Sequence, residues 1–239
     1  MVISVIAIIA MFFVNPIPQD QLYHSFADKN TFFSVPNFWN VISNLPFVFI
    51  GVLGLFKTFY LSKNYELKNS YVCFFIGIFL TGFGSGYYHY QPNDATLIWD
   101  RIPMTITFMS FLSIIVGEFI NIKSGEKSLI SLISVGLFSI SYWVLFKDLR
   151  PYALVQFLPI ILILLILLFS EKNKEFKKYF YFIVIFYFIA KVLENKDDFI
   201  YSITSEHISG HSLKHLFASA APFVFYKYFL SKNNLINKL

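Results

Sequence analysis

The sequence predicts an all-α integral membrane protein, a bundle of seven transmembrane helices with an extra N-terminal anchor or signal helix. Hydrophobic residues make up 56% of the 239 residues and charged residues only 14%, whereas soluble domains typically carry about 25% charged residues. The mean hydropathy is +0.62. Seven separate apolar runs each come close to the about 20 residues that a helix needs to cross a bilayer.

The seven predicted helices follow one another along most of the chain. Their approximate ranges are 41–61, 70–90, 97–120, 128–146, 151–170, 179–193 and 211–230. The connectors between them, such as "SKNYELKN" and "NIKSGEK", are short and polar. Because no internal repeat or long linker divides this part of the sequence, residues 21–239 are predicted to form a single domain.

The N-terminal residues 1–20 form a separate segment. They carry no charge before Asp20, and their apolar core of about 14 residues is shorter than a full membrane span. The segment has neither a basic start nor a clear small-x-small cleavage site, which a secretory signal peptide would show. We therefore expect an uncleaved signal anchor, with a removed signal peptide as the alternative.

The basic residues predict how the bundle lies in the membrane. Twelve of the 19 Lys and Arg residues fall in or beside the connectors after the first, third and fifth predicted helices and at the C-terminus. The opposite side keeps the other seven: Lys29, Arg101, Lys147, Arg150, Lys191, Lys196 and Lys214. The positive-inside rule then places the C-terminus in the cytoplasm. No Lys/Arg-rich stretch with interleaved aromatic residues suggests nucleic-acid binding.

This topology brings polar residues from three distant segments to one membrane face. The second predicted helix ends in "GSGYYH", which contains Ser85 and His89. The third begins with "WDRIP", which contains Asp100, and the seventh begins with "GHSLKH", which contains His211 and His215. Ionisable residues at membrane depth are costly and therefore often functional. We expect these five side chains to lie at one level, near the extracytoplasmic surface.

Their chemistry suggests a zinc site. Catalytic zinc is commonly held by three protein ligands that leave a fourth position for water, and His89, His211 and His215 supply that number. Bound zinc acidifies water to a pKa near 7. Asp100 could then orient or deprotonate the water, and Ser85 could donate a hydrogen bond to the developing oxyanion.

Simpler interpretations exist for each motif. An isolated HxxxH pair can hydrogen-bond lipid headgroups or neighbouring helices. Ser85 can be a packing residue, because Gly82 and Gly86 on either side of it form a GxxxG pattern that permits close helix contact.

Other polar residues are expected outside the site. We interpret His24 and His207 as loop histidines. The acidic residues of "ENKDD", Glu194, Asp197 and Asp198, are expected to form a solvated cap rather than a second metal site.

Taken together, the motifs resemble those of the alkaline ceramidase family, within a larger set of seven-helix hydrolases that includes adiponectin-receptor and haemolysin-III-like proteins. The shared pattern is S-x-x-x-H from Ser85 to His89, a downstream Asp100, and H-x-x-x-H from His211 to His215. The segment "NFWNVISNLPFVFIG" is similar to the family's entry into its first core helix. The resemblance extends from about residue 23 to residue 230.

The resemblance implies that the three histidines bind zinc and that Ser85 and Asp100 assist hydrolysis of a lipid amide, such as that of ceramide, to a fatty acid and a sphingoid base or similar amine. Eukaryotic members also have an acidic calcium site. This sequence has Asn37 where an acidic residue precedes "FWN", and Asp28 is the one obvious carboxylate in "YHSFADK". The calcium site therefore does not carry over. The N-terminal segment is similar to bacterial members, which implies the bacterial inner (plasma) membrane.

Functions of other classes fit the sequence less well. The main alternative is a non-catalytic seven-helix receptor or lipid-binding protein with a structural zinc. A metal-ion transporter would need polar residues through the bilayer, but residues 128–146 and 151–170 have few of them. A haem-binding electron carrier would give Ser85 and Asp100 no role.

Overall fold

The computed structural model describes residues 2–61 and 65–236, and its regular structure is helical. The short helices are α1 (Val2–Met11), η1 (Gln21–His24), α2 (Phe38–Ile42), η2 (Lys174–Phe176) and α9 (Asp197–Ile203). The long helices are α3 (Leu45–Phe59), α4 (Lys68–Tyr90), α5 (Asp94–Phe119), α6 (Ile122–Phe146), α7 (Arg150–Phe169), α8 (Lys177–Asn195) and α10 (Gly210–Ile236). The all-α prediction is confirmed.

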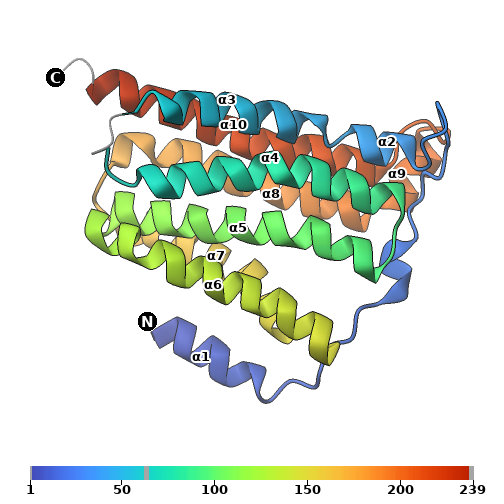
Figure 1. The fold of residues 1–239 in the computed structure, drawn as a ribbon, viewed down its shortest axis with the longest axis horizontal. Coiled ribbons are helices and arrows are strands. Elements are labelled where there is room, and N and C mark those ends of the chain that lie inside the picture. Colours follow the sequence, from blue (N-terminus) through green and yellow to red (C-terminus); the bar gives the residue numbers. More distant parts are fainter. Residues whose placement is uncertain (1, 62–64, 237–239) are drawn as a thin grey trace.

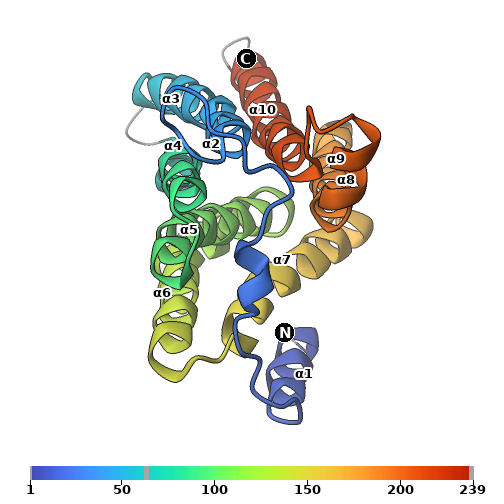
Figure 2. The same ribbon diagram turned by 90° about the vertical axis from the view of Figure 1, so that its right-hand side faces the viewer.

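Six of the long helices form a closed ring. Along the ring α3 contacts α4, α4 contacts α5, α5 contacts α7, α7 contacts α8, α8 contacts α10, and α10 returns to α3. The view along the bundle in Figure 2 shows this arrangement, with α6 packed outside on α5 and α7. In Figure 1 the long helices run side by side, and the short helices α2 and α9 both lie at the end of the bundle opposite the C-terminus. The interior of the ring is therefore bounded by residues from distant parts of the sequence.

Five helical segments are long and apolar enough to cross a membrane: Phe38–Phe59, which combines α2 and α3, and then α4, α5, α6 and α7. This indicates an integral membrane protein. Within the described residues, α8 and α10 do not reach the same hydropathy. Both contain charged residues that face the ring interior, including Lys191, Glu194 and Lys214, and these residues reduce the mean hydropathy.

The close contact between α4 and α5 positions two of the predicted site residues. Asn93 caps the start of α5 by accepting hydrogen bonds from the first-turn N–H groups, as an N-cap residue should. Gly84 faces α5 so closely that an added Cβ would lie 2.0 Å from the carbonyl oxygen of Trp99. Only glycine fits there, and this contact brings Ser85 beside Asp100.

The N-terminal segment is tied to the α6–α7 connector. Arg150 donates to the carbonyl oxygen of Val14 at 2.6 Å and pairs with Asp148, whose carboxylate also accepts from the backbone N–H of Ile17. Helix α1 has ten residues, and a helix of this length spans about half of the hydrocarbon core. The role of this segment as a signal anchor stays a prediction.

Candidate metal centre

Three helix ends meet at the end of the bundle that carries α2 and α9. His89 lies in the last turn of α4, Asp100 in the second turn of α5, and His211 and His215 in the first two turns of α10. Ser85 lies one turn before His89. All five side chains are buried, with exposed fractions between 1% and 8%. The structure therefore brings together the residues that the sequence selected.

The three imidazoles are arranged around a common point. One ring nitrogen from each of His89, His211 and His215 lies within 4.8 Å of the others. The Nε2 atoms of His89 and His215 are 3.1 Å apart, close to the about 3.3 Å expected between two nitrogens bound to one tetrahedral zinc. These three residues could bind a metal ion.

A hydrogen-bond chain orients His215. The Ser43 hydroxyl donates to the carbonyl oxygen of Asn40 at 3.2 Å, and its Oγ lies 2.7 Å from Nδ1 of His215. With its hydroxyl proton donated to Asn40, Oγ can accept a hydrogen bond from Nδ1–H of His215. The lone pair of Nε2 is then directed at His89. Metal-binding histidines commonly use such a partner to fix the ring, and the sequence analysis did not identify Ser43.

We expect Ser43→Ala to weaken metal binding without preventing it. Loss of the acceptor leaves Nδ1 of His215 unpaired and the ring less well oriented, and such changes lower metal affinity by about 10–100-fold. Competition between the purified protein and a chelator for Zn²⁺ measures the effect. Ser141→Ala is the matched control, because Ser141 is exposed and bonds only its own helix. Equal affinities in both variants would contradict the assigned role of Ser43.

Phe26 covers the metal centre. Its ring lies 4.5 Å from that of His211 and 4.7 Å from that of His89, measured between centroids, and it is 4% exposed. It belongs to the loop before α2, which passes across this end of the bundle (Figure 2). Phe26 keeps bulk water from two of the imidazoles. Nothing in its sequence context marks it, because the contact depends on how the loop crosses the helix ends.

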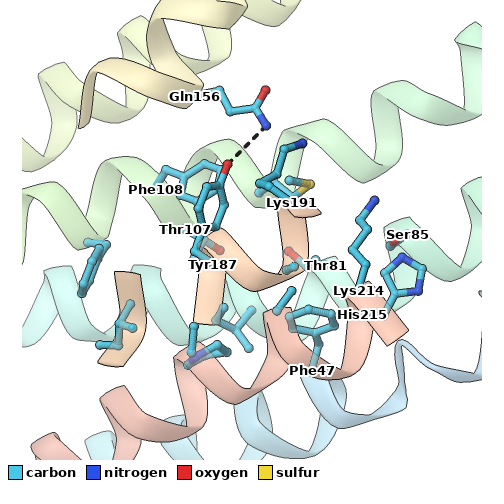
Figure 3. A pocket seen from close by; sticks show the side chains of 18 of the residues that line it. Phe47, Thr81, Ser85, Thr107, Phe108, Gln156, Tyr187, Lys191, Lys214 and His215 are labelled. Carbon is cyan, nitrogen blue, oxygen red and sulfur yellow. Dashed lines mark hydrogen bonds between the residues drawn. The ribbon is translucent and has the colours of Figure 1, made fainter. Parts of the chain in front are cut away.

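A cavity of about 250 Å³ lies at the centre of the ring and reaches the histidine cluster at His215. All of its charged lining residues, together with Ser85 and His215, lie near the helix ends that carry the metal centre: Asp100, Arg101, Lys191, Glu194 and Lys214. Uncharged polar residues such as Thr107 and Gln156 line it further along. Its apolar lining residues lie further along the same helices and include Phe74, Phe111, Ile163, Ile183 and Phe225. Figure 3 shows part of this lining. The cavity therefore has one polar and one apolar end, as an amphiphilic ligand requires.

The acidic residues of "ENKDD" do not form a solvated cap, so that expectation is wrong for two of the three. Glu194 lines the cavity and pairs with Lys191 and with Lys214, the latter at 2.6 Å. Asp197 accepts from the backbone N–H of His211 at 2.7 Å and thereby fixes the start of α10. Asp198 is exposed. The error arose because sequence proximity to a helix end does not reveal which side chains face the ring.

The remaining histidines lie outside the cluster. His207 is exposed in the loop before α10. His24 contacts Tyr88 Oη at 2.9 Å and Asp94 at 3.0 Å, and thus fastens the N-terminal segment to the ends of α4 and α5.

The loop carboxylate that the sequence singled out is isolated. Asp28 is buried, accepts one hydrogen bond from the backbone of Asn30 and has one oxygen without a partner. Burial raises the pKa of Asp28, and the hydrogen bonds from Asn30 offset part of the rise. In the described part of the chain it is in no cluster of three or more potential metal ligands.

Comparison with protein families places most of the chain in a known family. A family model described as Ceramidase matches residues 30–234, which is most of the chain. The matched region contains α2 to α9, nearly all of α10 and all five residues of the predicted site. No curated protein matches the chain.

Proposed function

The chain belongs to the Ceramidase family, and from this premise we propose that it is a zinc-dependent membrane amidohydrolase. It cleaves the N-acyl amide bond of ceramide or a similar lipid and releases a fatty acid and an amino lipid such as a sphingoid base. The observation that carries the proposal is a cluster of three buried imidazoles that borders, through His215, a cavity with an apolar far end.

His89, His211 and His215 would hold the zinc through neutral imidazoles. When bound, zinc acidifies a nearby water and polarises the substrate carbonyl. Ser43 supports this role, because its contact with Nδ1 of His215 orients the ring with Nε2 towards His89.

Asp100 and Ser85 assist the acyl transfer. The buried Asp100 carboxylate accepts a proton from the attacking water and delivers it to the leaving nitrogen, while the water oxygen bonds to the carbonyl carbon and the C–N bond breaks. The Ser85 hydroxyl donates to this carboxylate in the resting site. Once Asp100 has taken the proton from water, the hydroxyl can donate to the carbonyl oxygen as negative charge develops there. Both residues line the cavity, where the amide would lie.

The protein would lie in the bacterial inner membrane as one domain with seven spanning helices. Helices α8 and α10, with 19 and 27 residues, are long enough to cross the bilayer and complete the ring around the cavity. The bias of basic residues places the C-terminus in the cytoplasm and the metal centre towards the extracytoplasmic face. Residues 1–20 would act as a signal anchor, or as a signal peptide.

The alternative function is a non-catalytic receptor or lipid-binding protein with a structural zinc. A structural zinc site is usually closed by four protein ligands. Within the described residues, the cluster contains three His and no fourth His, Cys, Asp or Glu. This donor set favours the hydrolase.

The test is lipid turnover by the purified protein. The protein in detergent micelles is analysed for bound metals and incubated with C16-ceramide, and fatty acid and sphingoid base are quantified by mass spectrometry. We expect equal amounts of the two products, loss of turnover after chelation and recovery with Zn²⁺. A zinc-loaded protein that hydrolyses no N-acyl lipid would favour the receptor.

A further inference from the structure

The polar end of the cavity carries more positive than negative charge. The charged side chains that line it are Asp100, Arg101, Lys191, Glu194 and Lys214. Three cations against two carboxylates leave a net charge of +1 with the histidines neutral. Asp100 lies within electrostatic range of Lys214, Arg101 and Glu194, so these groups act on the same space. Unbalanced charge is costly in a buried environment, and a bound anion would compensate for it.

Arg101 offers an unused hydrogen-bond donor to such an anion. Its side chain is 6% exposed, and Nη2 donates to Gln19 at 2.7 Å, but Nη1 is buried without a partner. Within the described part of the chain it forms no salt bridge. Buried donors are normally paired, and an unpaired one is destabilising. The free Nη1 therefore indicates where an acceptor from a ligand would bind.

The guanidinium of Arg101 is held firmly in place. Its central carbon lies 4.3 Å from the ring centroid of Trp143 and 4.6 Å from that of Tyr152, distances typical of cation–π contacts. These aromatic residues come from α6 and α7. The two aromatic rings hold the faces of the guanidinium, and its Nη1 has no hydrogen-bond partner. Such a group is suited to bind a carboxylate or a related oxyanion.

Two lysines supply the second part of this positive region. Lys191 and Lys214 share the single carboxylate of Glu194, which can neutralise only one of them. Lys214 Nζ also lies 3.3 Å from Nε2 of His211 and is therefore next to the metal centre. Figure 3 shows both lysines extending to the same side of α8 and α10, with His215 beside Lys214.

We propose that Arg101, Lys191 and Lys214 bind an anionic group on the amine-bearing part of the substrate. The preferred substrates are then N-acyl lipids with a carboxylate or another oxyanion close to the amide. Ceramide, whose amine part is neutral, is a poorer substrate. This inference rests on the proposed function, because it assumes that the amide lies at the metal centre, and it specifies the substrate class for that reaction.

Three substrates with the same acyl chain test the inference. N-palmitoylglycine carries a carboxylate, N-palmitoyltaurine carries a sulfonate, and N-palmitoylethanolamine is neutral. Because a hydrogen bond to a charged group contributes about 1.5–3 kcal/mol, we expect kcat/KM to be about 10–100-fold higher for the preferred anionic substrate than for the neutral one. The carboxylate and sulfonate arms identify which oxyanion fits.

Variants then assign the preference to residues. Arg101→Gln and Lys214→Gln should each raise KM for the anionic substrate about tenfold or more and lower the ratio of kcat/KM between the anionic and the neutral substrate by a similar factor. Arg101→Lys, which keeps the charge, should restore part of the preference and controls for loss of packing against Trp143. Lys127→Gln removes the same charge from an exposed site outside the cavity and should change neither substrate.

The outcomes separate the two proposals. If the wild type hydrolyses the neutral amide and ceramide as well as the anionic amides, the charge preference is wrong and the proposed function stands. The same conclusion follows if Arg101→Gln and Lys214→Gln lower turnover of all three substrates equally. If the zinc-loaded wild type hydrolyses no amide at all, the proposed function itself fails and the inference fails with it.

Discussion

His215→Ala is expected to lose both bound zinc and lipid hydrolysis. His215 supplies the nitrogen 3.1 Å from His89 Nε2, and its removal leaves two imidazoles where a catalytic zinc needs three protein ligands. Loss of a residue that only orients a ligand lowers metal affinity or activity by about 10–100-fold. Loss of the ligand itself should exceed the upper end of that range, with less than one zinc per protein by metal analysis.

The comparison must separate lost zinc from lost folding. His215 is 3% exposed, so the variant also leaves a cavity. Its migration as a single species in detergent gel filtration and its helical circular dichroism should match those of the wild type. His207→Ala is the matched control, since His207 is exposed and lies outside the cluster. A His215→Ala protein that retains stoichiometric zinc and full turnover would refute the metal centre.

The positions of the long helices were predictable from the sequence to within a few residues. The expected range 70–90 corresponds to α4 at Lys68–Tyr90, and 151–170 corresponds to α7 at Arg150–Phe169. Each long apolar run is bounded by polar connectors, and a helix in the membrane must satisfy its own backbone hydrogen bonds. The pattern of apolar runs and polar connectors therefore predicts one helix for each apolar run.

The convergence of the metal centre was predictable for a different reason. His89 and His215 are 126 residues apart, but charge bias and the alternation of helix direction place their helix ends on one side of the bundle. The depth of each residue then follows from its distance to the helix end. The same reasoning placed Asp100 near Ser85.

The surroundings of the centre could not be predicted from periodicity. Ser43 and Phe26 lie in the break between α2 and α3 and in a loop, respectively, so no helical spacing relates them to the histidines they contact. Arg101 and Glu194 were assigned only to membrane topology and to a solvated cap. The side chains of Arg101 and Glu194 face the ring because of how α5 and α8 are rotated about their own axes. Packing against the neighbouring helices determines that rotation.

Seven spans were predicted, and hydropathy identifies five in the described residues; the seven-span count therefore stays a prediction. Lys191, Glu194 and Lys214 lower the apolar character of α8 and α10, yet they line the interior cavity. Charged residues in membrane helices usually face the bundle interior and serve function. The two ring helices with the lowest hydropathy, α8 and α10, therefore contribute most of the charged residues that line the cavity.

Asp100→Asn is expected to abolish most hydrolysis while zinc stays bound. Asparagine has the same shape, and Asp100 is not in the three-histidine cluster, so metal content should remain at the wild-type level. The amide cannot accept a proton from water or return it to the leaving nitrogen. General acid–base catalysis typically contributes 10²–10⁴-fold, and we expect kcat to fall by about that factor, with KM changed much less.

This variant distinguishes the two classes of function more sharply than loss of a ligand does. In a receptor with a structural zinc, Asp100 has no proton to transfer. Asp100→Asn would then change neither lipid binding nor stability, and the wild type itself would hydrolyse no lipid. Asp198→Asn, which removes an exposed carboxylate, is the matched control and should retain full activity. If zinc-bound Asp100→Asn hydrolysed lipid amides at the wild-type rate, the role assigned to Asp100 would be wrong. Another group would then have to transfer the proton, and Glu194 is the other carboxylate that lines the cavity.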